Sequence, residues 1–134
     1  MIFKQVFDEK SSTYTYIIAS AKGREALIID PVIENVNSYI HILKELDLKL
    51  VKVIDTHIHA DHVTGASELK AETSCVTVMG ENTPADTVDL KLKDEEIIKI
   101  DQLKIKAMYT PGHTSDSYSF LMDNYLFSGD TLLI

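Results

Sequence analysis

Three histidines and an aspartate lie close together near the middle of the chain. They belong to residues 56–62, THIHADH, which follow the apolar stretch 50–54, and the candidate ligands there are His57, His59, Asp61 and His62. Since the whole chain has only five histidines, this density is a strong signal. Imidazole nitrogens and carboxylate oxygens together form sites suited to iron, zinc or manganese. The run therefore predicts a metal site.

Two more candidate ligands follow downstream, His113 in the segment TPGHT and Asp130 in the segment SGDT. Each comes after a glycine, which allows the backbone to approach a site closely. A carboxylate after an apolar strand is also costly without a cation or hydrogen bonds. Asp61 has a second possible role as the N-cap of the helix that follows it. We expect the other histidine, His41, to be a surface residue.

Composition limits the remaining function classes. The 134 residues suit one domain, and the net charge of −8 argues against a nucleic-acid partner, which would require clustered lysine and arginine. No stretch approaches the roughly 20 apolar residues of a membrane span. The single cysteine, Cys75, cannot form an internal disulfide, so we expect a small buried side chain and a reducing compartment, the cytoplasm.

Strands and helices must bring these side chains together. Residue patterns predict an antiparallel meander from strands 2–7, 14–19 and 25–29, and then a helix over 35–47 that Asn35 or Asn37 caps. The strand 50–54 would carry the histidine run at its carboxyl end, where open α/β sheets place their sites. The remaining predictions are a helix over 61–73, strands over 75–79, 88–92, 96–100 and 103–110, a solvated turn at 93–96, and a hairpin of 117–122 with 125–127.

The three motifs together resemble those of the metallo-β-lactamase superfamily. Within it, residues 59–66, HADHVTGA, and 129–134, GDTLLI, are similar to those of persulfide dioxygenases, which are glutathione-dependent, mononuclear non-haem iron enzymes. The resemblance implies an α/β fold, the αββα sandwich of that superfamily, of which residues 1–134 would form mainly the N-terminal half. The single domain is then expected to be incomplete at its C-terminus.

The resemblance also implies a set of site residues. One Fe(II) would be held by His57, His113 and Asp130, which would also be the catalytic centre. His59, Asp61 and His62 would surround this centre or hold a second metal. The implied reaction oxidises glutathione persulfide to sulfite with O₂.

Two alternatives stay open on the same residues. The first is a dinuclear thioester hydrolase of the glyoxalase II type with two zinc ions. His57, His59 and His113 would bind one metal, Asp61 and His62 the other, and Asp130 would bridge them; that family usually has a histidine where Ile58 stands. The second alternative is a non-catalytic metal-binding fragment.

The chain is considerably shorter than the family domain that it resembles. A half-sandwich would expose an apolar sheet face, which predicts association or instability. We therefore expect a homo-oligomer, or a chain completed by a missing C-terminal half.

Overall fold

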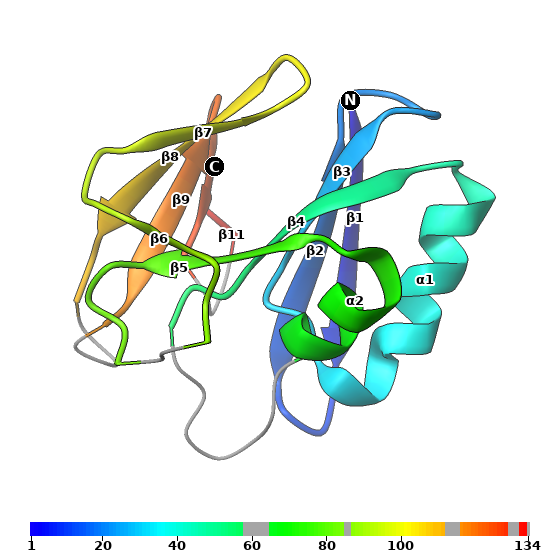
Figure 1. Cartoon of the computed structure of the whole chain (residues 1–134), viewed down its shortest axis with the longest axis horizontal. Helices are drawn as coiled ribbons and strands as arrows, with labels where there is room; N and C mark the ends of the chain where they lie inside the picture. The colour runs from blue at the N-terminus through cyan, green and yellow to red at the C-terminus, as the bar shows by residue number, and fades with distance from the viewer. Residues whose placement is uncertain (58–64, 85–86, 112–115, 129–131, 134) are drawn as a thin grey trace.

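The computed structural model describes residues 1–57, 65–84, 87–111, 116–128 and 132–133. It shows a layer of helices, a six-stranded sheet and a five-stranded sheet stacked in that order (Figure 1). These are layers of the αββα arrangement that the sequence resemblance implied. Among the described residues, no helix is both long and apolar enough to cross a lipid bilayer.

The first sheet has the strand order β1-β2-β3-β4-β5-β6. β1 (Ile2–Asp8), β2 (Thr13–Ala19) and β3 (Glu25–Ile29) form the predicted antiparallel meander. From β3 onward the neighbours are parallel: β4 (Lys49–Ile54), β5 (Val76–Gly80) and β6 (Leu90–Leu92). The carboxyl ends of β3, β4, β5 and β6 therefore lie at one edge of this sheet.

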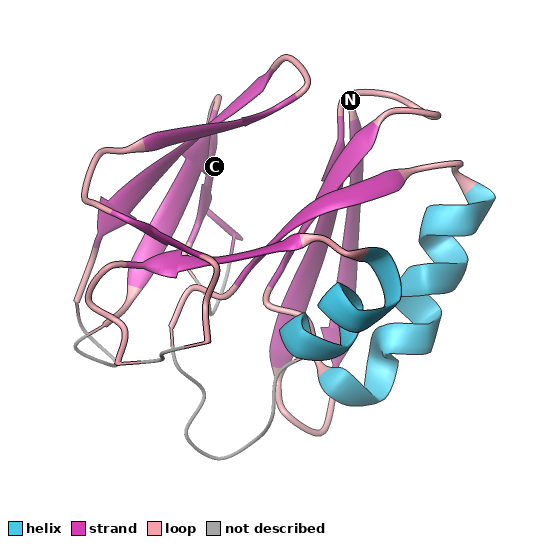
Figure 2. Ribbon diagram, in the orientation of Figure 1, coloured by secondary structure: helices cyan, strands magenta, loops and turns pink. Residues whose placement is uncertain are grey.

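Two helices connect the parallel strands. A 3₁₀ turn, η1 (Ile33–Asn35), leads into α1 (Val36–Glu45) between β3 and β4, and α2 (Ala66–Thr73) lies between β4 and β5. Both crossovers move in the same direction along the sheet, so right-handed connections place both helices on the same face (Figure 2).

The second sheet is antiparallel throughout, in the order β11-β10-β9-β8-β7. Its strands are β7 (Ile97–Ile100), β8 (Leu103–Tyr109), β9 (Tyr118–Met122), β10 (Tyr125–Phe127) and β11 (Leu132–Leu133). The predicted strands and hairpin are confirmed, whereas β11 was not predicted from the sequence.

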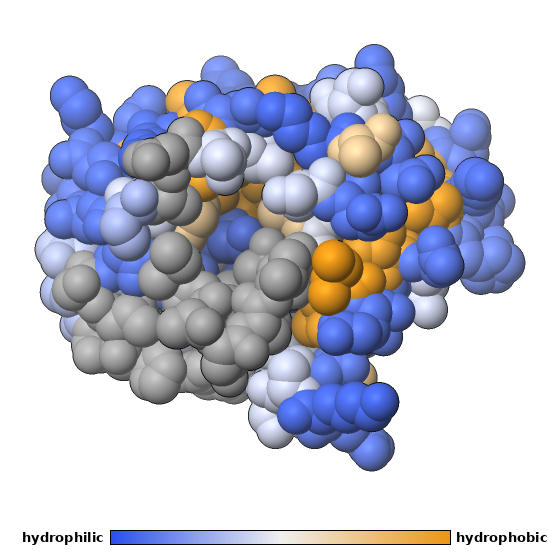
Figure 3. All heavy atoms as spheres, turned by 60° about the horizontal axis from the view of Figure 1, so that its bottom comes forward, coloured by the Kyte–Doolittle hydropathy of each residue, from blue (hydrophilic) through white to orange (hydrophobic). Residues whose placement is uncertain are grey.

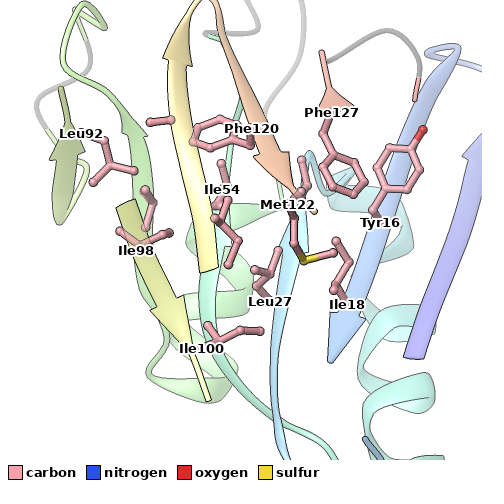
Figure 4. Packing of buried hydrophobic residues seen from close by; sticks show 14 of the residues in the cluster. Tyr16, Ile18, Leu27, Ile54, Leu92, Ile98, Ile100, Phe120, Met122 and Phe127 are labelled. Atoms are coloured by element: carbon pink, nitrogen blue, oxygen red, sulfur yellow. The ribbon is translucent and has the colours of Figure 1, made fainter. Parts of the chain in front are cut away.

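Alternating side chains of the first sheet serve two cores. In β2, Ile17 packs toward the helices, whereas Tyr16 and Ile18 pack toward the second sheet. Figure 4 shows the core between the sheets, where Leu27 and Ile54 face side chains of the second sheet such as Phe120. Because both faces of the first sheet are buried, its central strands are apolar along most of their length.

Two helix predictions need correction. Asn35 occupies the N-cap position of α1, but its side chain caps no backbone N–H; its Nδ2 instead donates to Asp8 Oδ1 at 3.1 Å. α2 begins at Ala66, with Gly65 as its N-cap residue. The rest of the predicted helix start, including the proposed capping role of Asp61, lies outside the described residues.

Candidate functional site

Of the six candidate ligands, the structure describes only His57. The others, His59, Asp61, His62, His113 and Asp130, lie outside the described residues. Among the described residues no three histidine, cysteine, aspartate or glutamate side chains gather into a metal-binding group. The geometry of the candidate site is therefore built from His57 and from the residues that flank the three motifs.

His57 follows β4 by three residues and is partly buried. Thr56 restrains the orientation of its ring, because Nδ1 lies 3.0 Å from the Thr56 hydroxyl oxygen. Thr56 is 1 % exposed, and Asp30, which directly follows β3, accepts two hydrogen bonds from it. Its N–H donates to Asp30 Oδ1 and its hydroxyl donates to Asp30 Oδ2, both at 2.8 Å. The ring orientation of His57 thus depends on the neighbouring parallel strand.

Asp30 is held in turn by a chain of buried hydroxyls. Its carbonyl oxygen accepts a hydrogen bond of 2.7 Å from the Thr15 hydroxyl, which lies 3.0 Å from the Tyr39 hydroxyl of α1. The Tyr39 hydroxyl also accepts the Val32 N–H at 3.1 Å. Asp30 has a left-handed backbone with φ of 54°, a conformation that aspartate tolerates better than most residues. Strands β2, β3 and helix α1 therefore fix the support of His57 together.

The flanks of the other motifs meet His57 at the same edge. Tyr118, which begins β9, donates its N–H to Thr56 O at 2.8 Å and so joins the second sheet to the histidine run. Tyr109 at the end of β8 pairs with Tyr118, and Phe127 at the end of β10 pairs with Phe120. The chain thus enters the segments that contain His113 and Asp130 from strand ends close to Thr56.

The Tyr118 ring lies directly against the backbone of β5. A methyl group added at Gly80 would come within 1.9 Å of the ring, so only glycine fits there. The Tyr118 hydroxyl donates to Asn82 Oδ1 at 3.1 Å, and burial raises the pKa of this phenol. Tyr118 is buried, as expected of a structural tyrosine, whereas Tyr109 is 37 % exposed.

Hydrophilic side chains cover most of the described surface at this end of the molecule, with a hydrophobic patch to the right (Figure 3). His41 lies away from the motif flanks, on α1, where its Nε2 is 2.8 Å from Glu45 Oε1 and solvent reaches both side chains. This confirms the prediction that His41 is a surface residue.

The sequence patterns did not identify Asp30 as a site residue; it directly follows the predicted strand 25–29. A signal was present in the sequence, because Asp30 directly follows four apolar residues, 26–29. In the structure Asp30 is 2 % exposed. A buried carboxylate needs several hydrogen bonds. The Thr15 and Tyr39 hydroxyls had no comparable signal, since threonine and tyrosine are common in strands and helices for other reasons.

A family model described as the metallo-beta-lactamase superfamily matches residues 9–86. A mouse (Mus musculus) protein named "Persulfide dioxygenase ETHE1, mitochondrial" is 35 % identical over 137 residues, which cover 100 % of this chain and 54 % of the mouse protein. The chain therefore spans about half the length of this curated relative.

A solved structure and a second curated protein are also similar. The crystal structure of ETHE1 from Myxococcus xanthus superimposes with a TM-score of 0.92 at 42 % identity and covers 100 % of this chain and 59 % of that one. A hydroxyacylglutathione hydrolase from Dictyostelium discoideum is 33 % identical over 131 residues, which cover 90 % of this chain and 48 % of the hydrolase.

Proposed function

Because the chain belongs to the metallo-β-lactamase superfamily, we propose that it acts as a persulfide dioxygenase, oxidising glutathione persulfide to sulfite with O₂ at one iron ion. The observation that carries this proposal is similarity over the full length of the chain. Proteins named as persulfide dioxygenase or ETHE1 match all of it, in sequence at 35 % identity and in structure at a TM-score of 0.92.

The described part of the site fits a metal ligand. His57 is partly buried and its Nδ1 is in contact with the Thr56 hydroxyl, so we propose that His57 would bind a metal through Nε2. We propose that His57, His113 and Asp130 hold Fe(II), a set of two histidines and one carboxylate that suits non-haem iron. His59, Asp61 and His62 would then surround these ligands. Bound iron would supply the redox chemistry toward O₂.

The role of this chain is to hold the ligands still and to limit access of water. Thr56 and Asp30 restrain the His57 ring, and the Tyr118 N–H holds the end of β4 against β9. The buried side chains beneath Thr56, including Asp30 and Thr15, exclude solvent from that side of the site. Such preorganisation keeps ligands in place without a rearrangement when substrate arrives.

A dinuclear hydrolase is the second candidate, because hydroxyacylglutathione hydrolases also match most of the chain. There, His57, His59 and His113 would bind one zinc, Asp61 and His62 a second, and Asp130 would bridge the two. A metal-binding fragment without turnover is the third candidate, since the chain spans about half of its curated relatives. We also propose that the chain forms a homo-oligomer or is completed by a C-terminal half.

Metal content and oxygen uptake test these candidates in sequence. The chain is purified without chelator or added metal, alone and in a form extended to the length of its relatives, and its metals are measured. About one iron per chain with O₂ consumption on addition of glutathione persulfide supports the dioxygenase. About two zinc ions with thioester hydrolysis and no O₂ uptake would replace it with the hydrolase.

A matched pair of histidine variants controls the measurement. His57→Ala should lose most of the bound metal and the O₂ uptake. His41→Ala removes the same side chain from the solvent-exposed face of α1 and should retain both. Metal in the purified chain without turnover on any of these substrates would favour the non-catalytic fragment.

We further propose a reducing compartment, the cytoplasm, because Cys75 is the only cysteine.

A further inference from the structure

The single hydrogen of the Thr56 hydroxyl determines how His57 is protonated. That hydroxyl donates to Asp30 Oδ2 at 2.8 Å, so it has no hydrogen left for the contact of 3.0 Å with His57 Nδ1. The contact must therefore use a hydrogen on Nδ1, and Thr56 must accept it. We infer that Asp30 acts through Thr56 as a positioning residue that keeps the hydrogen of neutral His57 on Nδ1 and the lone pair on Nε2.

A second set of buried hydrogen bonds, from Thr15, Tyr39 and Val32, has a fixed direction and holds Asp30 in place. Thr15 donates its hydroxyl hydrogen to Asp30 O, so the Tyr39 hydroxyl must donate to Thr15, and the Val32 N–H then donates to Tyr39. Each hydroxyl accepts one hydrogen and gives one. This arrangement holds the Asp30 backbone, while the Thr56 N–H at 2.8 Å from Oδ1 stops its carboxylate from turning.

The consequence for the site concerns which ring nitrogen of His57 would bind a metal. A neutral imidazole can bind a metal only through the ring nitrogen that carries no hydrogen. Asp30 therefore selects Nε2 as the binding nitrogen before any metal arrives. This consequence rests on the proposed metal function, whereas the tautomer is a property of the metal-free chain and can be measured without it.

Asp30→Asn should reverse the tautomer with little change in shape. The asparagine oxygen would accept the Thr56 N–H, and its NH₂ group would donate to the Thr56 hydroxyl. That hydroxyl would then be free to donate to His57 Nδ1, which places the ring hydrogen on Nε2. Asparagine also tolerates the left-handed φ of 54° at this position.

The test uses ¹⁵N spectra of the histidine rings in the metal-free full chain, at a pH where the rings are neutral, together with Zn²⁺ and Co²⁺ affinity. Wild type should show hydrogen on Nδ1 of His57, and Asp30→Asn should show it on Nε2. Metal affinity should fall about 10–100-fold in Asp30→Asn, the range measured for partners of metal-binding histidines.

Three further variants separate positioning from simple loss of stability. Thr56→Ser retains the hydroxyl and should retain the wild-type tautomer, whereas Thr56→Val should lose the preference. Asp101→Asn is the matched control, because Asp101 also has a left-handed φ, of 50°, and also accepts a backbone N–H and a hydroxyl, from Glu25 and Ser20. It should lower stability without changing the His57 signals.

Hydrogen on Nε2 in the wild type would overturn the inference, as would a wild-type tautomer that survives in both Asp30→Asn and Thr56→Val. If the wild type binds no metal but shows the Nδ1 tautomer that Asp30→Asn reverses, the inference stands and the proposed metal function fails. If the wild type binds metal and Asp30→Asn changes neither tautomer nor affinity, the inference fails and the metal function stands.

Discussion

Two side chains at the carboxyl ends of β3 and β4, Asp30 and Thr56, determine which ring nitrogen of His57 carries the hydrogen. Asp30 and Thr56 are 2 % and 1 % exposed, so their hydrogen bonds face little competition from water. A buried acceptor that loses its donor costs about 1–3 kcal/mol. The hydrogen bonds of Asp30 and Thr56 that orient His57 therefore also contribute to the free energy of unfolding.

Cys75 illustrates the opposite case, a reactive group that the fold keeps inert. It is 2 % exposed, and burial raises the pKa of its thiol above the usual 9.0. Since only the thiolate reacts, we expect iodoacetamide to modify native Cys75 about tenfold or more slowly than a free peptide of residues 73–77. Mass spectrometry over time measures this, and urea should restore the peptide rate. Equal rates in the native chain and the peptide would contradict the prediction.

At the scale of elements, hydrogen bonds join the turn between β7 and β8 in the second sheet to the turn between β2 and β3 in the first. Asp101, in the turn between β7 and β8, accepts hydrogen bonds from the Glu25 N–H at 3.0 Å and from the Ser20 hydroxyl at 3.3 Å. Arg24, the only arginine of the chain, lies 3.4 Å from the same carboxylate. The Asp101 N–H completes the exchange by donating to Glu25 Oε1 at 3.0 Å. This clamp joins the β2–β3 turn to the second sheet.

We expect Asp101→Asn to lower the melting temperature, because the amide cannot accept all of these hydrogen bonds. Asp123→Asn is the control, since Asp123 is exposed and also has a left-handed φ, of 53°, in the turn between β9 and β10. It should leave the melting temperature unchanged. Thermal unfolding followed by circular dichroism measures both, and equal effects of the two substitutions would argue against the clamp.

A second carboxylate makes stability depend on pH. Asp89 lies before β6, pairs with Lys70 of α2, and accepts the Thr77 N–H of β5 at 3.0 Å. The Lys70 ammonium, followed by the Thr77 N–H, lowers the pKa of Asp89 below its usual 3.8. The folded-state pKa is therefore below the unfolded one, so this contribution is complete above pH 3.8 and is lost as the pH falls through the folded pKa.

Asp89→Asn should therefore flatten the loss of stability below pH 3.8, and Lys70→Met should flatten it in part. Both variants should also be less stable than wild type near neutral pH, where the pair is intact. Urea unfolding at a series of pH values measures these differences. A variant with the wild-type slope in the acid range would show that Asp89 is not responsible.

At the scale of the whole molecule, the core between the sheets holds the two halves of the site together. Phe120 is fully buried in this core, whereas Phe7 is 47 % exposed. We expect Phe120→Ala to cost about 3–5 kcal/mol of unfolding free energy. Phe7→Ala should cost less than about 1.5 kcal/mol, mainly from its contact with Tyr14. Urea unfolding followed by two probes measures both, and similar costs would contradict this assignment of the core.

The outer face of the second sheet bears on the predicted association. It carries Ile97, Met108, Leu121 and Leu126 beside the lysines of β7 and β8. The total accessible area of 7193 Å² is nevertheless close to the roughly 7,000 Å² of a folded monomer of this mass. Association of the chain remains a prediction for sedimentation to test.

Local patterns in the sequence determined the elements. Runs rich in aromatic and β-branched residues predicted central strands of the first sheet, and alternation predicted several later strands. The spacing of Val36, Tyr39 and Leu43 predicted α1, because these residues must bury one stripe. The density of histidine in residues 56–62 predicted the chemistry of the site, and the family comparison agrees with the fold. These features depend on residues near one another in the chain, so they can be recognised without the tertiary structure.

Only the tertiary structure decided how the strands after β5 divide between the two sheets and what supports His57. β6 and β7 lie within a few residues of each other, but β6 pairs with β5 in the first sheet and β7 with β8 in the second. Asp30 and Thr56 are 26 residues apart and meet because β3 and β4 are parallel neighbours. Pairing across such separations depends on burial of whole sheet faces, which no local pattern encodes.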